Sequence, residues 1–138
     1  MVRLAFWRRT PDPLGNGVWK RAYHSVDRAV RRVEQMVDGC PPGPDRQALE
    51  LVLPRVDLVA RTCRALCVQA QADAPSTEFL VPGGPAGDHP EVHRRITRTA
   101  TACAQVAEAA AMVRVGAGYL DAVERAVVRA EELAGLRH

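Results

Sequence analysis

The sequence lacks any run of about 18 to 20 uncharged apolar residues, the length that a membrane-spanning helix needs. Its longest candidate, between Gln105 and Val115, is interrupted by Glu108 and Arg114. The opening stretch, MVRLAFWRR, is too short and too charged for a secretory signal peptide, and no small-residue cleavage site follows it. We therefore expect a protein that stays in the cytoplasm.

Lysine and isoleucine are almost missing, since each occurs once, as Lys20 and Ile96, beside 18 arginines, 22 alanines and 18 valines. This bias is typical of a GC-rich genome, so we attribute the arginines to codon usage and not to nucleic-acid binding. The formal charge is only +3, and its whole excess lies in residues 1–39, where eight bases face four acids. Over residues 40–138 the basic and acidic residues are close in number, which argues against a nucleic-acid partner.

The 47% apolar content and the small net charge exclude a chain that is disordered throughout. A chain of 138 residues buries enough surface to fold as one domain without a metal or a disulfide. No segment shows the alternation of apolar and polar residues that is typical of a β-strand, and no repeat of fixed period is present. The composition therefore favours a single all-helical domain.

Apolar residues recur at helical spacing in four segments. The first begins at Val18 and ends at Gly39, where a proline-rich turn follows. The third opens near Asp88, a possible N-cap, and its alanine-rich face predicts a central position between larger neighbours. The fourth begins at Leu120 with a core-facing residue and ends at Gly135.

The second segment starts at Asp45 and carries a heptad seam from Leu49 to Ala70. Pro54 lies inside it, where proline removes a hydrogen bond and crowds the carbonyl of Glu50. The helix either kinks there or begins anew near Leu53. We predict a kink, because the seam keeps its phase on both sides of the proline.

These segments predict an antiparallel four-helix bundle over residues 17–138. A basic and aromatic N-terminal extension with its connector occupies residues 1–16, and a long loop over residues 74–88 separates the second helix from the third. Short turns are expected within the first and the last helix pair.

Three histidines form the best candidate metal site. His89 and His93 are spaced four residues apart on one helical face, and His24 could join them from the first helix. Neither an HExxH nor a paired ExxH motif supports this site. The plainer interpretation is that His89 and His93 are exposed to solvent and that His24 has a structural role.

The sequence contains four cysteines but no CxxC pair. We expect Cys63 and Cys103 to fill the core and Cys67 to be partly exposed. Cys63 and Cys67 could instead form a redox or metal group with Cys103, although residues one helical turn apart do not usually reach disulfide geometry.

Three stretches could contact a partner. The N-terminal extension combines apolar and basic side chains suited to an anionic membrane surface, or Phe6 and Trp7 fold back over one end of the bundle. The apolar cluster of the long loop is expected to pack against the body of the bundle, or it could instead be presented to a partner as a recognition element. A basic stripe at the start of the third helix could bind phosphate or an acidic partner, or simply be solvated. The residues concerned are Arg3, Leu4, Phe6, Trp7, Arg8 and Arg9 in the extension, Phe79, Leu80 and Val81 in the loop, and Arg94, Arg95 and Arg98 in the stripe.

No phosphate-binding loop, GxSxG element or paired catalytic carboxylates stand out. We therefore expect a non-enzymatic interaction or regulatory protein that needs no cofactor and acts through protein–protein contacts. Self-association as a homodimer is expected, because a short bundle can extend its core across a two-fold axis. The alternatives are a metal-dependent bundle enzyme using the three histidines, and a peripheral membrane or nucleic-acid adaptor using the basic N-terminal end.

Overall fold

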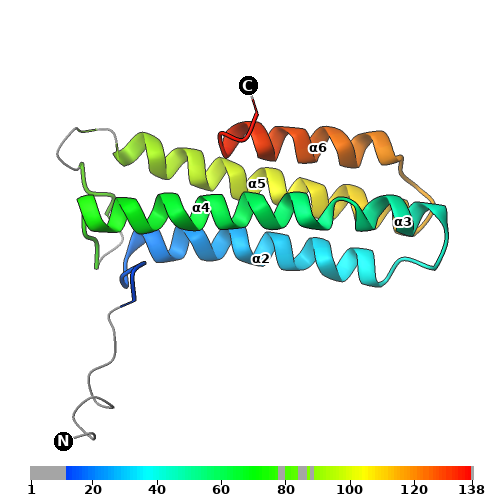
Figure 1. The fold of residues 1–138 in the computed structure, drawn as a ribbon, viewed down its shortest axis with the longest axis horizontal. Helices are drawn as coiled ribbons and strands as arrows, with labels where there is room; N and C mark the ends of the chain where they lie inside the picture. The colour runs from blue at the N-terminus through cyan, green and yellow to red at the C-terminus, as the bar shows by residue number, and fades with distance from the viewer. Residues whose placement is uncertain (1–11, 78–79, 84–86, 88, 138) are drawn as a thin grey trace, which may run out of the picture.

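The computed structural model describes residues 12–77, 80–83, 87 and 89–137. Every regular element in these ranges is a helix, which confirms the predicted all-helical class, and the four long helices pack together (Figure 1). The helices are α2 (Val18–Asp38), α3 (Pro44–Glu50), α4 (Leu53–Asp73), α5 (His89–Arg114) and α6 (Leu120–Leu133). Asp88 and the extension over residues 1–11 lie outside the described residues.

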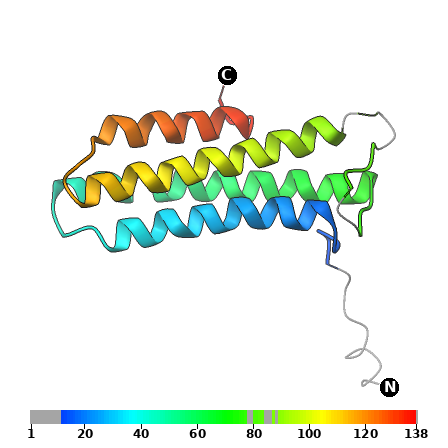
Figure 2. The same ribbon diagram turned by 180° about the vertical axis from the view of Figure 1, so that it is seen from behind.

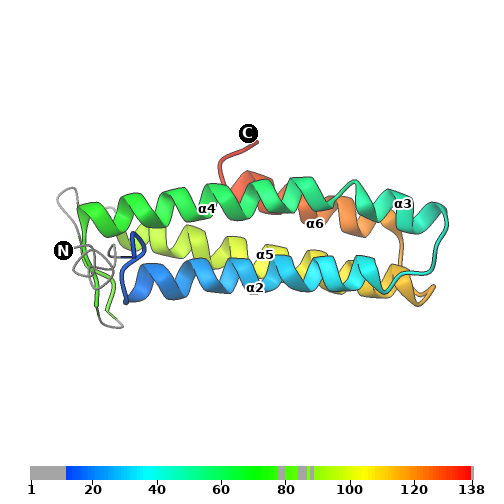
Figure 3. The same ribbon diagram turned by 60° about the horizontal axis from the view of Figure 1, so that its bottom comes forward.

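Consecutive long helices run in opposite directions along the bundle (Figures 1 and 2). The most extensive contact joins α2 to α5, which run in the same direction, while α4 and α5 touch little although they are consecutive (Figure 3). The connection over residues 74–88 therefore spans a diagonal of the bundle. Its length follows from this path, because direct neighbours need only about 2 to 8 residues.

The predicted kink at Pro54 is wrong, because the helix ends at Glu50 and begins anew at Leu53. Pro54 thereby occupies the first turn of α4, where its missing N–H group is not needed. Leu51 and Val52 still keep right-handed backbone angles and bond three residues back. Consequently the apolar seam keeps its phase across the break, and phase alone could not distinguish a kink from a new helix.

The core is built mainly from small aliphatic side chains, and Trp19 is the one aromatic side chain among the described residues that is fully buried. Each fully buried valine or leucine contributes about 1.5 to 3 kcal/mol relative to an exposed one. α5 buries three alanines, Ala102, Ala107 and Ala110, and packs against both α2 and α6, in agreement with the central position that its sequence predicted. The buried aliphatic residues include Val26, Val33, Leu49, Val56, Val59, Ile96, Val106, Val123 and Val127.

The loop after α4 holds the beginning of α2. Ser76 accepts a hydrogen bond at Oγ from the backbone N–H of Val18 at 3.3 Å, and the Trp19 indole N–H donates to the carbonyl of Ala74 at 3.0 Å. A side chain on Gly17 would meet Ser76 at 2.3 Å, so only glycine fits. Ser76 thus replaces the side-chain cap that α2 itself lacks.

The connector is part of this folded body where it is described. Leu14 is buried in the core cluster, and its backbone N–H donates to the Asp12 carboxylate at 2.9 Å. Asp12 also pairs with Lys20 at 3.0 Å. The chain is therefore fastened to α2 several residues before the helix begins.

The last helix ends on contacts from another helix. Gly135 adopts a φ of 83°, a left-handed conformation that favours glycine, and Leu136 bonds back to the carbonyl of Glu131. The Arg95 guanidinium of α5 donates to the carbonyls of Leu133 and Ala134 at 2.7 and 3.0 Å. Arg95 thus satisfies the carbonyls that α6 leaves unpaired at its end.

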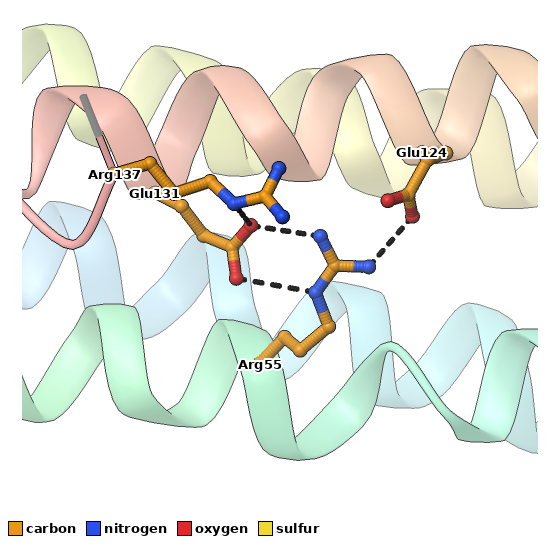
Figure 4. Close-up of polar contacts among 4 residues, drawn as sticks. All are labelled: Arg55, Glu124, Glu131 and Arg137. Carbon is orange, nitrogen blue, oxygen red and sulfur yellow. Dashed lines mark hydrogen bonds and ion pairs between the residues drawn. The ribbon is translucent and has the colours of Figure 1, made fainter.

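A charged cluster joins α4 to α6 (Figure 4). Arg55 makes two hydrogen bonds to the Glu131 carboxylate, at 2.7 and 3.1 Å, and a third to Glu124 at 2.6 Å. Arg137 approaches the same Glu131 at 3.4 Å. These bonds raise the pKa of Arg55, chiefly through Glu131, and lower the pKa of Glu124, chiefly through the hydrogen bond from Arg55.

None of the helices in the described ranges is both long enough and apolar enough to cross a lipid bilayer.

Candidate interaction surfaces

Two of the three candidate histidines lie against the buried Trp19. The ring centres of His89 and His93 are 6.0 and 5.8 Å from the Trp19 ring, each meeting it edge to face. His89 is buried, with Nδ1 3.2 Å from the carbonyl of Gly83. His93 is half-buried, and burial lowers its pKa.

The expectation that His89 and His93 are exposed and that His24 is structural is therefore reversed. His24 points outward from α2 and contacts only the neighbouring Tyr23 ring at 5.9 Å among the ring contacts of the described residues. The structure does not bring the three histidines together, and no group of three or more His, Cys, Asp or Glu side chains within the described ranges could hold a metal ion. The histidines at Trp19 instead fasten α5 to the start of α2.

Cys63, Cys67 and Cys103 form what we call the thiol cluster. All three are fully buried, so the expected partial exposure of Cys67 is wrong. The reason is that α2 packs against α4, and the backbone of Tyr23 in α2 lies close to Cys67. Burial raises the pKa of Cys63 to about 11 and those of Cys67 and Cys103 to about 12.

These pKa values keep the thiols protonated at neutral pH, whereas nucleophilic attack and metal binding both need the thiolate. All four cysteines are free in the structure. The three buried, protonated thiols therefore behave as core side chains, and the thiol cluster offers no activated nucleophile.

The three arginines of the basic stripe on α5 lie in different environments. Arg94 pairs with Glu91, and Arg95 is turned to the end of α6, whereas Arg98 is exposed. The stripe therefore presents fewer unpaired charges than its sequence spacing suggested.

The loop candidates are also separated by the fold. Leu80 is exposed and borders a surface cavity of about 200 Å³ together with Pro75 and Pro82, while Val81 packs against the core. Phe79 lies outside the described residues, as do all six candidates of the N-terminal extension.

A second basic surface, which the sequence pattern had not indicated, lies on α2. Lys20, Arg21, His24 and Arg28 of α2 lie on one helical face and, with Ser25, line an open surface cavity of about 400 Å³. We call this set the α2 basic face. The signal for it was the charge excess of residues 1–39, which could have been traced to one face by its spacing.

A cluster of exposed apolar side chains was also missed. Met112, Val115, Tyr119 and Leu120 lie in or beside the turn between α5 and α6, and Leu51 directly follows α3, which contacts both of these helices. The turn and α3 lie at the same end of the bundle (Figure 1). We call these five residues the apolar end. Val115 and Tyr119 are 71% and 79% exposed, and Leu51 is 74% exposed. Leu120 was expected in the core but is 37% exposed.

No protein-family model matches the chain, and neither the curated proteins nor the solved structures yielded a significant match.

Proposed function

We propose that this protein is a non-enzymatic interaction module that self-associates through its apolar end. The observation that supports this proposal is the gathering of exposed apolar side chains at one place. Among the described residues, five of the eight large apolar side chains that are exposed belong to the apolar end. Single apolar residues are ordinary on a protein surface, but a cluster of them favours an interface.

The positions of these residues in the fold favour one continuous surface. Leu51 precedes Arg55 by four residues, and Leu120 precedes Glu124 by four, and Arg55 and Glu124 are joined by a hydrogen bond of 2.6 Å. α4 and α6 run in the same direction, so Leu51 and Leu120 both lie toward the same end of the bundle (Figure 1). Tyr119 and Val115 lie in the adjoining turn.

The charges around the apolar end favour a second copy of the chain as its occupant. Glu50 and Asp121 are negative, whereas Arg46 and Arg114 are positive, and all four lie on the helices that form this end. A surface with both signs can face its own copy across a two-fold axis without a net like-charge penalty. A partner that carries charge of mainly one sign would gain little electrostatic attraction from these four residues.

Burying Val115 and Tyr119 supplies much of the driving force. Each large apolar side chain that leaves water contributes about 1.5 to 3 kcal/mol before the entropic costs of association are subtracted. Tyrosine also keeps its hydroxyl at the rim, which is why it is enriched in interfaces. The contact therefore belongs to an end-to-end dimer that dissociates on dilution.

Sedimentation equilibrium of the full chain over a range of concentrations tests the proposal. The wild type is expected to approach twice its monomer mass at high concentration, and Tyr119→Asp is expected to remain monomeric. The matched control is Leu80→Asp, which places the same charge on an exposed leucine outside the apolar end and should dimerise like the wild type.

Tyr119→Asp also separates loss of association from loss of folding. Tyr119 is the N-cap of α6 with an extended backbone and makes no side-chain cap. Aspartate there can accept a hydrogen bond from the first turn, so the monomer should be stabilised by about 1 kcal/mol. A wild type that stays monomeric throughout, or a Tyr119→Asp variant that dimerises like the wild type, would overturn the proposal.

A further inference from the structure

The outward face of α2 concentrates positive charge. Between Val18 and Val33 the chain has five lysine or arginine residues and a single acid, Asp27. Residues 20, 21, 24, 28, 31 and 32 recur at helical spacing, so their side chains share about a third of the circumference. The α2 basic face is the part of this run that surrounds a cavity.

The nearby carboxylates are already engaged. Asp27 accepts a hydrogen bond from Arg31 at 2.9 Å, and Asp12 pairs with Lys20 at 3.0 Å. The hydroxyl of Ser25 donates to the backbone carbonyl of Arg21. Within the described part of this face, five lysine and arginine residues thus stand beside two carboxylates, and the side chains that line the cavity are mainly cationic donors.

The cavity of about 400 Å³ is larger than a single phosphate ion requires and is open to solvent. The guanidinium groups of Arg21 and Arg28 have a planar fork that matches two phosphate oxygens, and Lys20, whose ammonium also pairs with Asp12, adds a point charge on the same side. Their spacing over two helical turns covers about 12 Å. A short chain of phosphates matches both this length and this charge.

The face has few features suited to larger polyanions. Single-stranded nucleic acid needs exposed aromatic rings for base stacking, but on α2 Trp19 is buried and Tyr23 is half-buried. A membrane surface needs apolar groups that insert between lipids, and the exposed large apolar residues of the described ranges all lie outside α2. Charge without stacking or insertion groups favours a compact, highly charged ligand.

We propose that the α2 basic face is a binding site for an oligophosphate group, carried either by a nucleoside triphosphate or by an inorganic oligophosphate. Arg21 and Arg28 grip the phosphate oxygens, Lys20 neutralises one end of the chain, and His24 lies between them as a further donor. The site is independent of the apolar end, which lies at the opposite end of the bundle from the start of α2 (Figure 1).

Isothermal titration calorimetry at low salt, with tripolyphosphate and ATP as separate titrants, tests the site. The double variant Arg21→Gln/Arg28→Gln should bind about tenfold more weakly than the wild type. The matched control, Arg94→Gln/Arg98→Gln, removes the same charge from the exposed side of α5 and should change affinity less than twofold. Similar affinities for both titrants would assign recognition to the phosphates, and tighter binding of ATP would assign part of it to the nucleoside.

A second measurement needs no variant. Lys20 is the only lysine in the sequence, so its reaction with an amine-selective reagent can be followed by mass spectrometry of a single peptide. Saturating tripolyphosphate should slow modification of Lys20 several-fold, while inorganic phosphate at equal ionic strength should protect it much less.

Three results would overturn the proposal. The first is unchanged reactivity of Lys20 in tripolyphosphate, and the second is an equal loss of affinity in the α2 and α5 double variants, which would reflect net charge alone. The third is binding of duplex DNA or of anionic phosphatidylserine vesicles that is tighter than tripolyphosphate binding and is lost in the α2 double variant, because the face would then serve a macromolecular surface.

Discussion

Replacing Arg55 with methionine should cost about 1.5 to 3 kcal/mol of unfolding free energy. Methionine keeps an unbranched apolar side chain at this position of α4 and removes the guanidinium, so the change reports on the charge and its hydrogen bonds. Three charge-assisted bonds are lost, two to Glu131 and one to Glu124 (Figure 4). Glu131 is only 12% exposed and is left with the longer contact to Arg137.

The cost stays below the 3 to 5 kcal/mol typical of a fully buried pair for two reasons. Arg55 is 30% exposed, so water screens part of the interaction, and Arg137 still offsets the charge of Glu131. A double-mutant cycle with Glu131→Gln should give a coupling of about 1 to 2 kcal/mol. The cycle with Glu124→Gln should give at most about 0.5 kcal/mol, because Glu124 is 53% exposed.

Urea unfolding followed by circular dichroism measures these values, with Arg61→Met as the control. Arg61 pairs with Asp57 one turn away, and both are exposed, so its loss should cost about 0.3 to 0.5 kcal/mol. At about 1 M salt the Debye length shrinks to about 3 Å, which should remove the Glu124 coupling and retain most of the Glu131 coupling. A coupling to Glu124 larger than that to Glu131, or an Arg55→Met cost no greater than that of Arg61→Met, would refute this reasoning.

Three further predictions follow from the same structure. Burial lowers the pKa of His93, so the unfolded chain binds a proton at a higher pH than the folded protein does. The stability that the neutral ring contributes is fully present above the unfolded pKa of about 6.5 and is lost as the pH falls below it. His93→Gln should flatten this pH dependence in thermal melts. Arg95→Gln should cost about 1 to 2 kcal/mol in urea unfolding, because two carbonyls at the end of α6 lose their donor, whereas Arg98→Gln should cost less than 0.5 kcal/mol. The thiol cluster should resist iodoacetamide at pH 8 in the folded protein and react fully in urea, as mass spectrometry would report; rapid labelling without denaturant would contradict its burial and its raised pKa values.

Helix ends were predictable where backbone chemistry decides them. The glycine and proline turn after residue 38 and the left-handed Gly135 mark ends that the structure places within a residue or two of the prediction. The break at Pro54 was not predictable from apolar phase, because Leu51 and Val52 stay right-handed across it and so preserve the seam.

Exposure of single side chains was harder to predict, because it depends on which helix covers which flank. Cys67 and His89 are buried by neighbours that are distant in the sequence, α2 in one case and the Trp19 region in the other. Helical spacing gives the direction in which a side chain leaves its helix, but it does not say which other helix covers that side. For the same reason the apolar end and the α2 basic face emerged only once the helices were placed together.

Short-span thiol crosslinking of a Val115→Cys variant tests the self-association most directly, because the natural cysteines are buried and Val115 lies in the apolar end. Since an end-to-end dimer brings this turn of both copies to the interface, a bis-maleimide should yield a covalent dimer of the full chain. Leu80→Cys, at a similarly exposed position in the loop before α5, should yield almost none. Equal crosslinking of the two variants, or no dimer from Val115→Cys at concentrations where the wild type associates, would contradict the account.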